Sequence, residues 1–267
     1  MPASETLRSR ANPLYKRLRA LRDKGAASSL CLIEGPKLAL EATLAGLTLL
    51  EAAASPRAET TPAGARALAA LHAHGVPVRR MAAELVASLS EAETSQGLIA
   101  LAKRPRFELA RVFRGTPLVL VIDGVQDPRN LGALLRSAEA AGATGALLTA
   151  GSADPLSWKA LRGSMGSAFR LPHVAGLTID AALEALAAHG VSVFATASDG
   201  ERLYDEADLR GPAAIVVGRE GSGLAPAVKR AAAARLRIPL QAPVESLNVG
   251  VAAALVLFEA ARQRTSR

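Results

Sequence analysis

A chain of 267 residues is long enough for about two domains, each with its own hydrophobic core. Half of its residues are apolar but only 3% are aromatic, so the cores must be built from closely packed Ala, Leu and Val. Such a composition favours helices lying on a mostly parallel sheet. The single cysteine, Cys31, excludes an intrachain disulfide framework and a cysteine-based zinc site.

The net charge of +8 indicates an anionic partner, and nucleic acid is the leading candidate. The alternative is a soluble protein in which Arg merely replaces Lys on solvated faces. Residues 1–5 lead into a charged segment, which is not the pattern of a signal peptide, and the apolar stretch 249–261 is too short to span a membrane. We therefore predict a cytoplasmic protein.

Residues 5–24 predict a basic amphipathic helix or arm, because leucines recur at helical spacing among many cations. The leucines are Leu7, Leu14, Leu18 and Leu21, and the cations are Arg8, Arg10, Lys16, Arg17, Arg19, Arg22 and Lys24. This pattern is typical both of a helix that contacts RNA and of a helix with an ordinary solvated face.

A small α/β domain is predicted over residues 1–105, because strand and helix patterns alternate there. Strands are expected at 30–33, 47–53, 76–80 and 98–102, and helices at 37–45, 63–74 and 82–88. Pro36 suits the first turn of its helix, where no amide hydrogen bond is lost. Proline and charge at 103–106, with Gly115-Thr-Pro117, indicate a linker over residues 106–116.

A second domain is predicted over residues 117–267, and its pattern is that of a doubly wound parallel sheet. Strands are expected at 118–122, 146–149, 191–195, 214–217 and 236–240, helices at 131–141, 155–161, 179–189 and 249–264, and an extended segment at 169–173. Gly142 should end its helix in the left-handed conformation. The last helix is apolar on several faces and must be covered on more than one side.

The helix that follows Asn130 carries a candidate functional arginine. Its leucines form a buried stripe, whereas Arg129, Gly132 and Arg136 share another face. Because Gly132 leaves room beside it, the guanidinium of Arg136 could lie in a crevice and clamp a phosphodiester. The alternative is a surface arginine paired with Glu139.

The loop 218–223 places Glu220 among glycines at positions 218, 221 and 223, which let backbone groups approach a ligand closely. A charge there needs a partner, and Arg136 or Arg219 could supply it. The glycine order fits neither the dinucleotide-binding nor the Walker pattern, so a plain tight turn is the competing interpretation.

Three further features have ordinary explanations when each is taken alone. Ser246 and Asn248 stand at the entry to the last helix, where Ser246 could be a simple N-cap and capping is the default explanation for either residue. Residues 163–167 fit a simple turn. The four histidines have no acidic or serine partner at useful spacing, so we expect neither a metal site nor a catalytic histidine.

Taken together, the sequence resembles the SpoU branch of the knotted SPOUT RNA methyltransferases. The three motifs of that family occur in order: Asn130-Leu-Gly-Ala-Leu-Leu-Arg136, then Val217-Gly-Arg-Glu-Gly-Ser-Gly-Leu224, then Ile238-Pro-Leu240 followed by Ser246-Leu-Asn-Val249. Residues 163–167 resemble the small-residue segment that precedes the second motif. One departure is Gly250, which stands where relatives often have Ser or Ala.

The N-terminal domain resembles the family's substrate-binding domain, which is similar to ribosomal proteins that bind kinked RNA. Leu32-Ile-Glu-Gly-Pro-Lys37 and Thr94-Ser-Gln-Gly97 carry this similarity. The two-domain layout implies ribosomal RNA, most simply 23S ribosomal RNA, as the substrate. The implied RNA-binding residues are Arg8, Arg10, Lys16, Arg17, Lys37 and Arg129.

The resemblance implies an α/β fold with a C-terminal trefoil knot that binds S-adenosylmethionine, and a homodimer whose protomers complete each other's active sites. The implied cofactor-binding residues are Ala195, Thr196, Gly218, Gly223, Ile238, Leu240 and Leu247. The implied reaction is methylation of a ribose 2′-hydroxyl in RNA. Its catalytic residues would be Arg136, Glu220, Asn130, Ser246 and Asn248.

Arg136 is a poor base because a guanidinium is already protonated and gives up that proton only with difficulty. We therefore expect it to hold the adjacent phosphate and to stabilise the developing alkoxide, with Glu220 orienting it. The alternatives are a tRNA ribose methyltransferase, a non-enzymatic RNA-binding or ribosome-assembly protein on the same fold and, more remotely, a nucleotide-dependent oxidoreductase. Routine ribosomal modification and antibiotic-resistance methylation are both compatible with the two-domain layout.

Overall fold

The computed structural model describes residues 6–24, 28–219 and 223–265. The chain divides into two compact units. The first comprises the residues up to Pro105 together with Leu156–Phe169, and the second comprises Arg106–Pro155 and Arg170–Arg267. In the described parts of the chain, no helix is long and apolar enough to cross a membrane.

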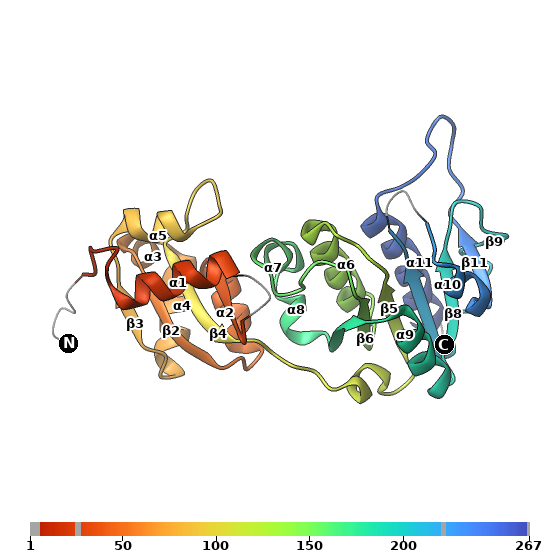
Figure 1. Ribbon diagram of the computed structural model, residues 1–267, viewed down its shortest axis with the longest axis horizontal. Coiled ribbons are helices and arrows are strands. Elements are labelled where there is room, and N and C mark those ends of the chain that lie inside the picture. The colour runs from red at the N-terminus through yellow and green to blue at the C-terminus, as the bar shows by residue number, and fades with distance from the viewer. Residues whose placement is uncertain (1–5, 25–27, 220–222, 266–267) are drawn as a thin grey trace. The chain divides into compact units, whose positions relative to one another are not determined.

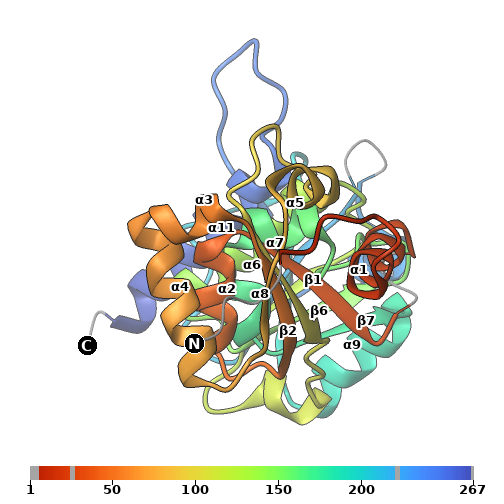
Figure 2. The same cartoon turned by 90° about the vertical axis from the view of Figure 1, so that its left-hand side faces the viewer.

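The first unit contains a four-stranded sheet with helices on both faces. Its strands are β1 (Leu30–Glu34), β4 (Leu98–Lys103), β2 (Leu49–Ala54) and β3 (Val78–Arg80), in that spatial order, and only the β2–β3 pair is parallel. Helices α2 (Pro36–Leu44) and α4 (Pro62–Ala73) pack together on one side. Helices α1 (Pro13–Lys24) and α5 (Ala83–Leu89) share the core of the other side, and Figure 2 shows α1 across the sheet from α2 and α4.

Helix α1 confirms the predicted amphipathic pattern but begins later than residue 5. The Asn12 side chain accepts a hydrogen bond from the backbone N–H of Leu14 at 2.9 Å, and Pro13 suits the first helical position. Leu14 and Leu18 are buried, whereas Lys16, Arg17 and Arg19 are exposed. Before the cap, Leu7 forms an isolated parallel bridge with Met81, and a turn at residues 10–11 leads into the helix.

The second unit contains the predicted parallel sheet, with seven strands in the order β7-β6-β5-β10-β8-β11-β9. These strands are β5 (Leu118–Ile122), β6 (Gly145–Thr149), β7 (His173–Leu177), β8 (Ser192–Thr196), β9 (Arg202–Leu203), β10 (Ala213–Val217) and β11 (Ala234–Arg237). Figure 1 labels β5, β6, β8, β9 and β11 of this sheet. Every neighbouring pair is parallel. The doubly wound prediction is therefore confirmed.

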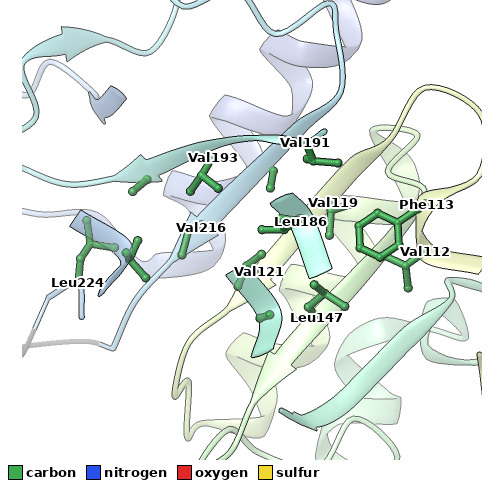
Figure 3. Close-up of a cluster of buried hydrophobic side chains, with 14 residues drawn as sticks. Val112, Phe113, Val119, Val121, Leu147, Leu186, Val191, Val193, Val216 and Leu224 are labelled. Atoms are coloured by element: carbon green, nitrogen blue, oxygen red, sulfur yellow. The ribbon is translucent and has the colours of Figure 1, made fainter. Parts of the chain in front are cut away.

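Helices cover both faces of this sheet. Helices α6 (Pro128–Ala140) and α11 (Val249–Thr265) pack together, and α9 (Ile179–Ala188) packs with α10 (Pro226–Ala231) against the opposite face. The sheet side chains under α9 and α10 alternate along the strands, as period-two geometry requires (Figure 3). Gly142 follows α6 with a φ of 77°, which confirms the predicted left-handed cap.

The segment expected as a linker packs into the second unit. It contains the 3-10 helix η2 (Leu109–Phe113), and Val112 and Phe113 are buried in the cluster of Figure 3. The Thr144 hydroxyl donates a hydrogen bond to the carbonyl of Val112 at 2.6 Å. Residues 106–116 therefore contribute to the core beside β5 and β6.

Some predicted elements are wrong in type or position. Residues 169–173 were expected to be extended, but α8 (Ser167–Arg170) occupies the first part of this range. The expected helix at 155–161 lies later, as α7 (Trp158–Ser164), because the Ser157 side chain caps it at the amide of Ala160. The expected strand at 236–240 ends at Arg237, since Pro239 has no N–H to donate to a ladder. The short elements α3 (Pro56–Thr60), β9 and α10 were not predicted.

The end of α11 is tied to two segments that lead into central strands. The Arg264 guanidinium donates hydrogen bonds to the carbonyls of Thr116 at 3.1 Å, Pro117 at 3.0 Å and Leu209 at 2.9 Å. It also donates to the carbonyl of Gly211. Burial lowers the pKa of this guanidinium below its usual value. The four carbonyl contacts fix the start of β5 and the start of β10 to the same side chain.

Candidate active site at the carboxyl edge of the parallel sheet

Three neighbouring strands of the second unit bring the predicted cofactor residues to one edge of the sheet. Ala195 of β8 is in register with Val216 of β10 and with Arg235 of β11. Thr196, Gly218 and Ile238 therefore stand where these strands end, as the rule for parallel sheets predicts. The Thr196 hydroxyl donates to the carbonyl of Val216 at 3.2 Å, and Ile238 is half-buried.

The loop that follows β10 folds back tightly on itself. Arg219 and Gly223 form an antiparallel bridge, and Gly223 has a φ of 68°. A Cβ atom added at Gly218 would lie 2.8 Å from the Gly223 carbonyl oxygen, so no larger residue fits without movement of the loop. Backbone groups are thus free to face a ligand here. Glu220, predicted to orient Arg136, lies outside the described residues.

A pair of asparagines joins the first and third motifs. The Asn248 amide donates a hydrogen bond to the Asn130 Oδ1 atom at 3.0 Å, linking the start of α6 to the start of α11. The Asn248 Oδ1 atom also accepts from the backbone N–H of Gly250 at 2.9 Å. Asn248 is therefore the cap of α11. Capping, the default explanation for a Ser or Asn at this entry, is confirmed for Asn248, whereas the suggestion that Ser246 is the N-cap is wrong. Ser246 itself is exposed in the preceding loop.

Gly250, the departure from the family pattern, lies close to this link. A Cβ atom added there would be 3.1 Å from the Asn248 Oδ1 atom and 3.6 Å from the Cβ of Ala133. Glycine at this position therefore relieves a close contact beside the asparagine pair.

We expect Asn248→Ala to destabilise the second unit by about 0.5–2 kcal/mol, because it removes the cap of α11 and the link to Asn130. The measurement is urea unfolding followed by circular dichroism. Asn248→Ser is the matched control, because its hydroxyl can still cap the helix. It should recover most of the loss. A destabilisation by Ser equal to that by Ala would contradict the capping role.

Arg136 is exposed on α6, so the second unit of a single chain does not enclose it in a crevice. Within residues 6–24, 28–219 and 223–265, no acidic side chain forms an ion pair with it. Glu139 instead pairs with Arg170, at 2.7 Å and 2.9 Å, so the alternative of an Arg136–Glu139 surface pair is wrong. The guanidinium of Arg136 is therefore available to an anion.

The comparisons with known proteins agree with these motifs. The model of the SpoU rRNA Methylase family matches residues 117–258. The chain belongs to this family. A relative from Xylella fastidiosa, a 23S rRNA (guanosine-2′-O-)-methyltransferase called RlmB, is 37% identical over 72% of this chain and 80% of its own length.

Solved structures extend the SpoU similarity over almost the whole chain. A crystal structure of an RNA 2′-O ribose methyltransferase has a TM-score of 0.84 and 36% identity, covering 97% of this chain and 99% of that chain. An AdoMet-bound rRNA methyltransferase from Sinorhizobium meliloti has a TM-score of 0.85 and 29% identity, covering 98% and 99%. The α/β fold with its parallel sheet is thus that of SpoU enzymes.

The remaining predicted residues of the SpoU chain lie in several places. Leu240 and Leu247 are half-buried in the loop between β11 and α11. The predicted RNA-binding residues are all exposed, five of them in the first unit and Arg129 in the second. Arg17 is already paired with Glu51 at 2.9 Å, so this cation is the least available of the set.

Sequence reasoning missed a cleft of ≈ 430 Å³ at the same edge of the SpoU sheet. It lies on the β5, β6 and β7 side of the loop after β10, and its polar lining includes Asp123, Thr149 and Arg219. A signal was present, because Asp123 directly follows an all-apolar strand and must therefore stand at a carboxyl edge.

Proposed function

We propose that this SpoU protein methylates the ribose 2′-hydroxyl of a guanosine in 23S ribosomal RNA, using S-adenosylmethionine. The observation that carries the proposal is the joining of the first and third motifs by the Asn130–Asn248 hydrogen bond, beside strands whose ends carry Thr196, Gly218 and Ile238. The choice of a guanosine in 23S RNA as the substrate rests on the activity for which the Xylella relative is named. The cofactor is that of the AdoMet-bound neighbour.

The residues at the sheet edge fit S-adenosylmethionine. Gly218 leaves its backbone open, Thr196 offers a hydroxyl, and Ile238, Leu240 and Leu247 offer half-buried apolar surface. A nucleoside with a charged tail needs this combination of apolar walls and few polar groups. When bound, the sulfonium supplies an activated methyl group, so the protein must mainly align the hydroxyl and help to remove its proton.

Arg136 supplies the main electrostatic contribution in this proposal. Its guanidinium binds the phosphate next to the target ribose and stabilises the alkoxide that develops on the 2′-oxygen. The proton passes to phosphate or solvent, because a guanidinium is a poor acceptor. Asn130 and Asn248 hold the two motifs in place, Ser246 positions the ribose, and Glu220 orients Arg136.

The first unit is the RNA-binding part in this proposal. Its exposed cations on and before α1, together with Lys37 at the start of α2, provide contacts with phosphates. The deep trefoil knot and the cytoplasmic location implied by the resemblance and the sequence belong to the same proposal and stay predictions.

A map of ribose methylation on cellular ribosomal RNA tests the proposal. Primer extension or mass spectrometry would compare a deletion strain with strains that express the wild type or Arg136→Ala. Loss of one guanosine 2′-O-methyl group, restored only by the wild type, is the expected result. Unchanged ribosomal RNA with a lost tRNA mark would favour the tRNA alternative. RNA binding without any methylation would favour the assembly-protein alternative.

We also propose that the protein is a homodimer that packs through α11. Val251, Leu255 and Phe258 lie on one face of this helix and are 49%, 37% and 50% exposed. An apolar stripe of this kind marks a protein interface. A second copy would cover it and could enclose the exposed Arg136.

Phe258→Glu should convert the dimer to a monomer at micromolar concentration, because a charge would replace an apolar anchor in the interface. Size-exclusion chromatography with light scattering measures the mass directly. Lys229→Glu on α10 is the control, because this side chain is exposed on another helix and should leave the dimer intact. A Phe258→Glu protein with the wild-type mass would show that α11 is not the interface.

A further inference from the structure

The cleft beside the loop after β10 carries two opposite charges that do not pair with each other. We call it the Asp123 cleft, after its acidic lining residue. Asp123 and Arg219 both line it, yet no ion pair joins them in the described part of the chain. Its remaining walls are largely apolar and include Leu177, Ile179 and Leu224. A volume of ≈ 430 Å³ is within the range of small-molecule sites.

The carboxylate of Asp123 is held in a fixed position. Its backbone N–H donates to the carbonyl of Val217 at 2.9 Å, which continues the β5–β10 ladder by one residue. The Thr149 hydroxyl donates to the Asp123 Oδ1 atom at 2.7 Å and accepts from the backbone N–H of Gly124 at 3.0 Å. The second carboxylate oxygen has no hydrogen-bond partner among the described residues, so it can accept from a ligand.

The side chain of Arg219 lies along two glycines, Gly124 and Gly151. It lies across Gly124, where an added Cβ atom would be 2.2 Å from Nε and 2.8 Å from Cγ. Its guanidinium reaches Gly151, where an added Cβ atom would be 3.6 Å from Nη2. Both glycines have positive φ values, 69° and 88°, so the backbone shape and the missing side chains together leave this path open.

A carboxylate and a guanidinium that line one cleft with partly apolar walls match a planar molecule with donors on one edge and acceptors on another. Guanine is such a molecule, since its N1–H and N2 amino groups donate while O6 and N7 accept. Adenine would place an acceptor, N1, against the carboxylate, and cytosine offers only its amino group. Proteins that recognise single-stranded RNA read exposed bases through hydrogen bonds to the base edges.

We propose that the Asp123 cleft binds the base of the target guanosine, with Asp123 reading N1–H and the 2-amino group and Arg219 reading O6 and N7. This inference rests on the proposed function. The position suits it, because β5 and β8 both neighbour β10, so the cleft and the cofactor residues flank the same loop. Two strand spacings are about 10 Å, which is the size of one nucleotide.

The test uses the full-length protein and a ribosomal RNA fragment that contains the mapped target nucleotide. Two versions of the fragment carry guanosine or inosine at that position, and inosine lacks only the 2-amino group. We expect the wild type to have a kcat/KM about 10–100-fold lower on inosine. Asp123→Asn should lose this discrimination, whereas Arg219→Gln should be slower on both fragments and keep their ratio, because inosine retains O6 and N7.

Two controls separate base reading from damage to the fold or the cofactor site. Asp180→Asn makes the same change at an exposed position at the start of α9 that does not line the cleft, and it should behave as the wild type does. Calorimetric titration with S-adenosylmethionine should give the same affinity for Asp123→Asn and for the wild type.

Four other results would overturn the inference, and one of them would also overturn the proposed function. Equal wild-type rates on guanosine and inosine, or wild-type discrimination by Asp123→Asn, would overturn the inference and leave the proposed function standing. A loss of S-adenosylmethionine affinity in Asp123→Asn that equals its loss of activity would assign the cleft to the cofactor and also overturn it. If the wild type methylates no RNA, the proposed function is wrong, and the inference is wrong as well.

Discussion

Arg136→Ala is expected to lower the rate of methyl transfer by about 100- to 1,000-fold, which is typical of removing one donor to a developing oxyanion. The fold should survive, because Arg136 is exposed and has no acidic partner among the described residues that its removal would leave unpaired. The measurement is single-turnover methyl transfer to ribosomal RNA at saturating cofactor. Arg136→Lys should recover only part of the rate, since an ammonium cannot bind a phosphate through two parallel hydrogen bonds.

Arg230→Ala is the matched control for this experiment, because Arg230 is exposed on α10 of the same unit. It should keep the wild-type rate. A wild-type rate in Arg136→Ala would remove this residue from the mechanism, and equal losses in both variants would indicate a general effect of charge on RNA binding.

Gly218→Val is expected to weaken S-adenosylmethionine binding by about 10- to 100-fold, because overpacking of a tight site costs on the order of 1–3 kcal/mol. The first atom of the new side chain would already meet the Gly223 carbonyl oxygen at 2.8 Å. The loop would then have to move, together with the backbone groups that we propose face the cofactor. Isothermal titration with S-adenosylmethionine measures the effect directly.

Gly211→Val is the control for the glycine substitution. A Cβ atom added at Gly211 meets no atom within 4 Å, so the side chain is tolerated there. Its cofactor affinity should equal that of the wild type. If Gly218→Val also bound the cofactor normally, the loop after β10 would not be part of the cofactor site.

The buried strands could be predicted from the sequence, because strands covered on both faces must be apolar throughout. Residues 118–122 and 213–217 show this pattern, and the structure buries every one of them. The grouping of Thr196, Gly218 and Ile238 was implied by the resemblance to the SpoU family, and it agrees with the rule that parallel strands end at one edge. The short helices α3 and α10 could not be predicted, because five or six residues are too few to show a helical period.

The pairing of Asn130 with Asn248 required the structure, because 118 positions separate the two residues and no local pattern relates them. The sequence also could not show which residue caps α11. Ser246 and Asn248 are both good capping residues, and only the first turn of the helix decides between them. The Asp123 cleft was missed because its residues come from several strands and loops.

The contacts of Arg264 restrain the second unit at one edge of its sheet. They fasten the amino ends of β5 and β10, the edge of the sheet opposite to the candidate site. Local opening is governed by how many contacts a segment must break, so the amino edge is the rigid end of these strands. The starts of β5 and β10 therefore keep a fixed spacing, and RNA bound at the carboxyl edge meets a sheet whose far edge is already fastened.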